Sequence, residues 1–263
     1  VRELAKANLF SISERTAGIL YVASAHARPS LKAVVDVAKG RGVPVLVDAA
    51  AQLPPAGNLR RFIAAGADLV VFSGGKVIQG PQASGILCGR RDLVMAAALQ
   101  HLDLDIFFAQ WRPPPSLIDK SRLKGLPHTG IGRPAKAGRE EIVGLLTALE
   151  LFLAESDASR HSRWLALMRR LGEGLAGVNH AQVALVNEQD VERVPLVRLT
   201  LDERAAGQSA LDLVIALQEA SPSVHVDPTL SGEGAILFNP ICLKANEPEI
   251  VARQVRARLV RER

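Results

Sequence analysis

The sequence predicts an α/β fold, in which a mostly parallel sheet carries helices on both faces. Apolar runs of strand length recur at residues 18–25, 43–50 and 68–73. They lack the alternation of a half-exposed strand, which is typical of a sheet that is buried on both sides. Segments with helical spacing of apolar residues lie between them, and this order of strand and helix indicates parallel strands joined by covering helices.

Local signals place each element of this first half. Strands are expected at residues 18–25, 43–50, 68–73 and 84–88, and helices at 31–40, 59–65 and 90–101. Gly42 and Gly66 are the expected stops of the first two helices. Asn58 is the expected N-cap of the second helix, because its short polar side chain suits that position.

The second half differs in composition. Residues 102–138 are rich in proline and glycine and read as a connector. After it we expect helices at 139–154, 159–175, 209–218 and 247–263, with strands at 183–186, 196–201, 223–226 and 235–238. The pattern predicts two domains: the C-terminal portion of a large domain over residues 1–125, and a small α+β domain over residues 126–263.

Composition narrows the functional class. The 263 residues are 48% hydrophobic and 22% charged, as in ordinary soluble domains, and no apolar run approaches the roughly 20 residues of a membrane span. Cys88 and Cys242 fit neither a disulfide framework nor a metal site, so we expect buried free thiols and a cytoplasmic setting. A net charge of +5 is modest. The arginines near the C-terminus are expected to form a solvated helix face rather than an RNA site.

Two strand ends carry polar residues that a core does not require. Asp48 ends the second strand, where it is either a cap or a ligand group. Lys76 follows the third strand after Gly74 and Gly75, glycines that let the chain turn sharply and a ligand approach. A lysine partly removed from water offers a neutral amine as a nucleophile. The alternative is a lysine in a surface loop.

The same stretch also reads as Ser-x-x-Lys, the signature of serine β-lactamases. That motif places both side chains on one helical turn, which Gly74 and Gly75 disfavour. The companion motifs Ser-Asp-Asn and Lys-Thr-Gly do not occur in the chain. We therefore reject this alternative and keep the pair of Asp48 and Lys76. An acid after one strand and a lysine after the next is how pyridoxal 5'-phosphate (PLP) is held in the aminotransferase-type fold.

The motifs around these residues resemble the selenocysteine synthase-like family of fold-type I PLP enzymes. This family includes seryl-tRNA seleniumtransferase and the D-glucosaminate-6-phosphate ammonia-lyase type. The resemblance covers essentially the whole chain and rests on residues 47–55, 58–60, 64–76, 80–82, 130–136 and 140–146. Its most specific part is Ser-Gly-Gly-Lys at 73–76 with Gly-Pro-Gln at 80–82.

The resemblance implies a role for several residues. Lys76 matches the Schiff-base lysine, and Asp48 matches the acid on the pyridine nitrogen of the cofactor. Ala50 lies where a small side chain packs on the ring, and Ser73 is placed to reach the phosphate.

Gly80, expected among the cofactor-binding residues, and Gln82 lie in a loop that is often near the subunit interface in this fold. Arg133 is the candidate ligand for a substrate carboxylate or phosphate, and the alternative is an ion pair at the domain junction. His128 and Lys136 are weaker candidates, expected to be structural.

The expected activity is α,β-elimination from a hydroxy amino acid or an amino sugar acid. The alternatives are selenium transfer to seryl-tRNA, transamination, and an inactive fragment. The small-molecule amino substrate would bind a homodimer or a higher oligomer, without tRNA and without a membrane. Members of the family carry a long segment before the part that matches residues 15–25. The chain begins at Val1 only shortly before that point, so we expect it to lack roughly a third of the protein and its phosphate-binding turn.

Overall fold

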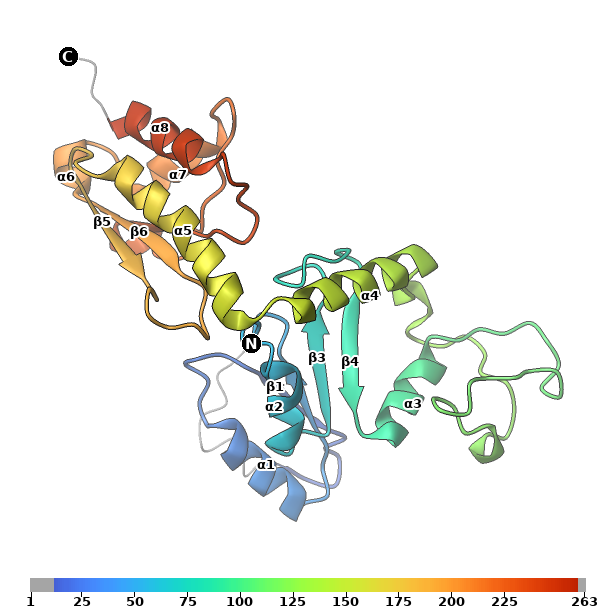
Figure 1. Ribbon diagram of the computed structural model, residues 1–263. Coiled ribbons are helices and arrows are strands. Elements are labelled where there is room, and N and C mark those ends of the chain that lie inside the picture. Colours follow the sequence, from blue (N-terminus) through green and yellow to red (C-terminus); the bar gives the residue numbers. More distant parts are fainter. Residues whose placement is uncertain (1–11, 260–263) are drawn as a thin grey trace. The chain divides into compact units, whose positions relative to one another are not determined.

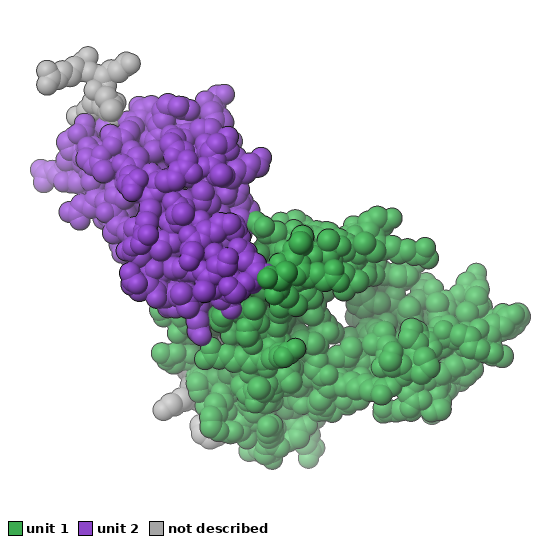
Figure 2. Space-filling view, in the orientation of Figure 1, with its two compact units in different colours: residues 1–154 green, residues 155–263 purple. Residues whose placement is uncertain are grey.

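The computed structural model describes residues 12–259. By its internal contacts the chain divides into two compact units, residues 1–154 and residues 155–263 (Figure 2). Each unit has its own sheet, and each is described by itself. The division follows Ala154. The predicted domain boundary at residue 125 stays a prediction for the organisation of the whole protein.

The first unit is built on a four-stranded sheet with the order β1-β2-β3-β4 (Figure 1). Three of its strands, β1 (Ile19–Val22), β2 (Val45–Asp48) and β3 (Leu69–Ser73), are parallel. The fourth, β4 (Gly85–Gly89), runs antiparallel to β3. All four strands were predicted, and the mostly parallel sheet is confirmed.

One face of this sheet is closed by α1 (Leu31–Gly40) and α2 (Asn58–Ala64). Val47, Val70 and Phe72 point to this face and are almost fully buried. The Phe72 ring lies 6.2 Å from the ring of Phe62 on α2, measured between centroids. Burial of these aliphatic and aromatic side chains stabilises the first unit.

The other face of the sheet is covered less completely. Leu93 of α3 (Arg91–Gln100) lines a hollow of about 290 Å³ together with Leu46 and Leu69. Towards the edge of the sheet, Leu20 and Val22 of β1 are 59% and 46% exposed. Helices therefore lie at both faces, as predicted, while part of the second face stays open.

The connector after α3 contains two short 3-10 turns, η2 (Lys120–Arg122) and η3 (Arg133–Ala135). Met95, Trp111 and Ile118 form a small core for it. Helix α4 (Arg139–Ala154) follows at the predicted position. Its apolar stripe is mostly exposed, however: Leu145 and Phe152 are buried, whereas Ile142, Val143 and Leu146 are exposed.

The second unit is a small α+β domain, with the long helix α5 (Asp157–Leu175) against a three-stranded antiparallel sheet. The strands, in spatial order, are β5 (Ala181–Val186), β6 (Leu196–Leu201) and β7 (Ala235–Phe238). The remaining helices are α6 (Glu203–Ala206), α7 (Ala210–Gln218) and α8 (Pro248–Leu259), with the 3-10 turn η4 (Ser231–Glu233) before β7. Its core is aliphatic, with Met168, Leu171 and Leu213 fully buried.

Three local predictions were wrong. The N-cap of α2 is Gly57 rather than Asn58. The segment 223–226 is not a strand, because only the isolated bridge between Asp227 and Leu237 forms there. Cys242 is exposed and Cys88 half-buried, so the expectation of two buried thiols does not hold.

Two arginines of α8 donate hydrogen bonds to carbonyl groups near the C-terminal ends of α5 and α7. The Arg256 Nε donates to the carbonyl of Gly174 at the end of α5, at 2.6 Å. The Arg258 Nε donates to the carbonyl of Ala216 in α7, at 2.7 Å. Cations suit these positions, because the last carbonyls of a helix lack intrahelical donors. The predicted helix extends to residue 263, and its last four residues lie outside the described part of the chain.

Among the helices of residues 12–259, none combines the length and the apolarity that crossing a membrane requires.

Candidate active site at the strand ends of the first unit

The carboxyl ends of β2 and β3 lie at the same edge of the sheet, because the two strands are parallel. Asp48 is the last residue of β2 and is the register partner of Val71. Ser73 ends β3, and Lys76 follows it by three residues. The fold therefore brings Asp48, Ser73 and Lys76 to one edge, where ligands bind in open parallel sheets.

Asp48 is half-buried, and both its side chain and its main-chain carbonyl accept hydrogen bonds from neighbouring backbone. Its Oδ1 accepts a hydrogen bond from the backbone N–H of Ala50, at 3.0 Å. Its main-chain carbonyl accepts from the N–H of Ala23, which follows β1, at 2.9 Å. Within residues 12–259, Oδ2 has no protein partner. One carboxylate oxygen thus shapes the turn after β2, and the other is left for a ligand.

The turn before Lys76 requires two glycines because other groups approach it closely. A Cβ on Gly74 would lie 2.9 Å from Leu145 Cδ1 and would overlap Ser84 Oγ. A Cβ on Gly75 would lie 2.7 Å from Gln82 Cα. Neither residue has a positive φ. The sequence predicted a sharp turn at these glycines; the structure shows that the need is for space.

The loop after Lys76 folds back onto this turn. The Gln82 Nε2 donates to the carbonyl of Gly75 at 3.1 Å, and the Gly80 N–H donates to the carbonyl of Gly74 at 2.9 Å. Val77 and Ile78 are buried and anchor the loop in the unit. The motif Gly-Pro-Gln at 80–82 therefore holds the backbone that presents Lys76.

The Lys76 side chain itself is exposed. Its Nζ makes no hydrogen bond or ion pair with the described residues, and the Ser73 hydroxyl makes none either. The partial removal from water that we expected for this lysine is not provided by residues 12–259. Lys76 is nevertheless free to bond to a ligand, next to a turn whose backbone is tightly held.

Arg133 belongs to η3, which is held at the end of α3. The Gly132 N–H donates to the carbonyl of Gln100 at 2.8 Å. Within the described chain the Arg133 guanidinium is exposed and makes no hydrogen bond or ion pair, and His128 and Lys136 are also exposed. No hydrogen bond joins this segment to Asp48 or Lys76, so its place in the site stays a prediction.

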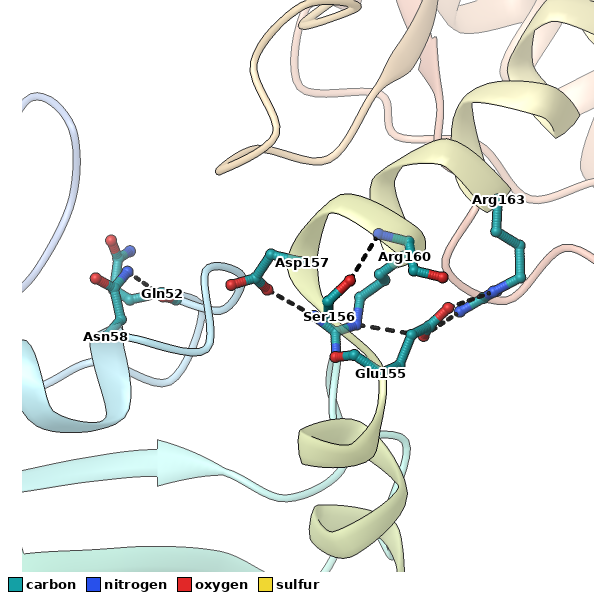
Figure 3. Close-up of polar contacts among 8 residues, drawn as sticks. Gln52, Asn58, Glu155, Ser156, Asp157, Arg160 and Arg163 are labelled. Atoms are coloured by element: carbon teal, nitrogen blue, oxygen red, sulfur yellow. Dashed lines mark hydrogen bonds and ion pairs between the residues drawn. The ribbon is translucent and has the colours of Figure 1, made fainter.

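Sequence reasoning missed two amides beside the site, the half-buried Gln52 and the buried Asn58. The Gln52 Nε2 donates to the carbonyl of Ala23 at 2.9 Å. The Asn58 Nδ2 donates to the carbonyl of Gln52 at 2.6 Å (Figure 3). Asn58 is only 8% exposed. The signal was present in the sequence, but an asparagine before a helix resembles an ordinary cap.

The start of the second unit carries a charge network (Figure 3). Arg160 is 2% exposed, and its Nη1 donates to Asp157 Oδ1 at 2.6 Å. Glu155 accepts from Arg163 Nε and Nη2 at 3.0 and 2.9 Å. This fork of hydrogen bonds lowers the pKa of the Glu155 carboxyl, against the opposing effect of partial burial. The network fixes the first turns of α5.

Residues 21–105 match the family described as L-seryl-tRNA selenium transferase. The chain is 31% identical over 250 residues to a 5'-C-glycyluridine monooxygenase-decarboxylase from a Streptomyces species. That match covers 93% of this chain and 55% of the relative. The chain is 24% identical over 250 residues to D-glucosaminate-6-phosphate ammonia lyase from Salmonella typhimurium, covering 94% of this chain and 58% of the relative.

A solved D-glucosaminate-6-phosphate ammonia-lyase structure superposes with a TM-score of 0.69 at 24% identity, over 95% of this chain and 59% of that chain. This likeness shows that the fold is shared. The chain spans somewhat more than half the length of these relatives. The matches in sequence and fold confirm the resemblance that the sequence indicated: the chain is related to the selenocysteine synthase-like PLP enzymes of the aminotransferase-type fold.

Proposed function

We propose that this chain is part of a PLP-dependent enzyme that performs α,β-elimination on a hydroxy amino acid or an amino sugar acid. One observation carries the proposal. Asp48 and Lys76 follow adjacent parallel strands at one edge, with a carboxylate oxygen and an amine that have no partner within residues 12–259. The relative named D-glucosaminate-6-phosphate ammonia lyase supports an elimination that releases ammonium.

The residues of the site fit PLP. Lys76 would bond to the aldehyde carbon of the cofactor, and Asp48 Oδ2 would accept a hydrogen bond from the protonated pyridine nitrogen. Ala50 has a side chain small enough to lie against a ring, and the Ser73 hydroxyl is free to donate to the phosphate. When bound, PLP withdraws electrons from the substrate Cα.

The protein contributes proton transfer and charge. The Lys76 amine would be the base that takes the proton from the substrate Cα, and its ammonium form would return that proton to the departing β-hydroxyl. A carboxylate at the position of Asp48 would stabilise a proton on the pyridine nitrogen, because a nearby opposite charge favours the protonated form. Departure of the β-hydroxyl as water, followed by hydrolysis of the remaining product, yields one 2-keto acid and one ammonium per substrate. Arg133 is the proposed ligand of the substrate's carboxylate or phosphate.

We also propose that the complete enzyme is a homodimer or a higher oligomer and acts in the cytoplasm on a free small molecule. The cysteines within residues 12–259 are unpaired, which supports a reducing compartment. Selenium transfer to seryl-tRNA is the second candidate, favoured by the family match over residues 21–105. A steep salt dependence of tRNA binding would favour it.

The cofactor site is tested by mixing the protein with PLP, reducing with borohydride and mapping the modified peptide by mass spectrometry. We expect a pyridoxyl group on Lys76 alone, and none in Lys76→Arg. Labelling spread over Lys32, Lys124 and Lys136, and unchanged by Lys76→Arg, would contradict the site. The reaction is tested by measuring ammonium and 2-keto acid from hydroxy amino acids, which elimination releases in equal amounts.

A further inference from the structure

Ala23, the residue that follows β1, extends the pairing of β1 with β2 to the end of β2. The N–H of Ala23 donates to the carbonyl of Asp48 at 2.9 Å, and its own carbonyl accepts from Gln52 Nε2 at 2.9 Å. Ala23 is only 9% exposed, so water competes little for either bond. The side chain of Gln52, which follows β2, therefore bonds back to the end of β1. Through Ala23 it is linked to the main chain of Asp48.

Asn58 in turn bonds to Gln52. Its Nδ2 donates to the main-chain carbonyl of Gln52 at 2.6 Å, from the first residue of α2. Its Oδ1 is buried and has no hydrogen-bond partner in the described residues. Burying an acceptor without a donor is unfavourable, and an apolar side chain of the same size would avoid it. The amide is therefore placed here for its donor and not for packing.

These contacts form a continuous path from α2 to the acid, running from Asn58 through Gln52 and Ala23 to Asp48. We propose that Gln52 and Asn58 are positioning residues, which hold the end of β1 against the end of β2 and so fix the place of the Asp48 carboxylate. The inference rests on the proposed function, in which that carboxylate faces the ring nitrogen of PLP. Neither amide needs to touch the cofactor.

A purely structural role would lower stability without altering the Asp48 turn. The amide proton of Ala50 separates the two readings, because it is bonded to Asp48 Oδ1 and makes no contact with either amide side chain. If the path acts on Asp48, weakening it at Gln52 or Asn58 speeds hydrogen exchange at Ala50. A structural role alone lowers stability and speeds exchange at the protected amides of the first unit by a common factor, so only acceleration at Ala50 beyond that factor supports the positioning role.

The experiment compares Gln52→Glu, which keeps the shape and loses the donor, with Asn58→Leu, which keeps the volume and loses the amide. Gln182→Glu on β5 is the matched control, since the Gln182 side chain is exposed and makes no hydrogen bond with residues 12–259. Residue-resolved amide exchange and thermal unfolding are measured on the full chain without PLP. We expect exchange at Ala50 to be roughly tenfold faster in both test variants, as for the loss of one buried hydrogen bond, and unchanged in the control.

The same proteins are then titrated with PLP, alone and with Asp48→Asn. We expect Gln52→Glu to weaken PLP binding roughly fivefold to tenfold in the wild-type background and less than about twofold in the Asp48→Asn background, because the effect passes through the acid. Exchange at Ala50 that rises by no more than the common factor, or equal weakening in both backgrounds, would overturn the positioning role. Failure of the wild type to bind PLP would instead overturn the proposed function, while the exchange result would still decide the role of the two amides.

Discussion

Gly74 and Ser84 are in contact across the loop that presents Lys76. The N–H of Gly74 donates to the carbonyl of Ser84 at 2.9 Å. The Ser84 hydroxyl, which donates to the carbonyl of Pro81 at 2.5 Å, occupies the place that a Cβ on Gly74 would need. The loop therefore closes only around a residue without a side chain, and α4 adds Leu145 from a second direction.

The first prediction concerns this close approach. Gly74→Ala is expected to lower the free energy of unfolding by about 2 kcal/mol, because both Ser84 and Leu145 must move to admit the methyl group. Gly40→Ala is the control, since nothing lies within 4 Å of its added Cβ. Urea unfolding measures both variants. Equal stability of the two would show that the loop is not packed as described.

The second prediction concerns the buried guanidinium of the second unit. Arg160→Leu is expected to lower the free energy of unfolding by about 3 kcal/mol, because Asp157 and Glu155 lose an ion-pair partner that is 2% exposed. Arg169→Leu breaks an exposed pair with Glu188 and is expected to cost less than about 1 kcal/mol. Chemical denaturation followed by Trp164 fluorescence reports on this unit. A small loss for Arg160→Leu would mean that the network contributes little.

The third prediction concerns pH. The hydrogen bonds from Arg163 lower the pKa of Glu155 in the folded protein. Its stabilising contribution is therefore fully present above the unfolded value of about 4.3, and is lost as the pH falls through the lower folded value. Glu155→Gln should therefore remove the part of the acid-induced loss of stability that comes from protonation of this carboxyl. Thermal unfolding between about pH 7 and pH 3 measures it, and parallel curves for both proteins would contradict it.

The fourth prediction concerns the two thiols. Cys242 is exposed, whereas burial raises the pKa of the Cys88 thiol and so lowers its thiolate fraction at neutral pH. A disulfide reagent should therefore react quickly with Cys242 and slowly with Cys88, because only the thiolate attacks. Cys242→Ser should remove the fast phase and leave the slow one. A fast phase that survives this change would show that Cys88 is accessible.

The strands and helices of this chain could be predicted because their signals are local. The apolar run at Leu69–Ser73 and the helical spacing at Leu31–Gly40 each lie within one short segment. Parallel strands then place Asp48 and Lys76 at one edge. The candidate site follows from this order of residues, and its assignment to PLP stays a proposal.

The partners of individual side chains could not be predicted in the same way. Asn58 has the sequence context of a cap, yet it is the first residue of α2, and its side-chain amide donates to the carbonyl of Gln52 in the preceding loop. The helical spacing of apolar residues in α4 is typical of a buried face, yet Ile142 and Leu146 are 50% and 55% exposed.

The sequence by itself determined the order of elements and placed the two residues that we propose for the chemistry, Asp48 and Lys76, at the ends of neighbouring strands, since periodicity and turn chemistry act over a few neighbouring residues. Only the tertiary structure decided that Gly74 and Gly75 are needed because other groups pack closely against them. It also decided that Gln82 bonds to the loop that carries Lys76, and that Gln52 bonds to the residue paired with Asp48. Some of these contacts join residues distant in the sequence, such as Gly74 with Leu145 and Gln52 with Ala23, and the others close loops of several residues. Their geometry depends on how whole strands and helices are placed, which no local pattern specifies.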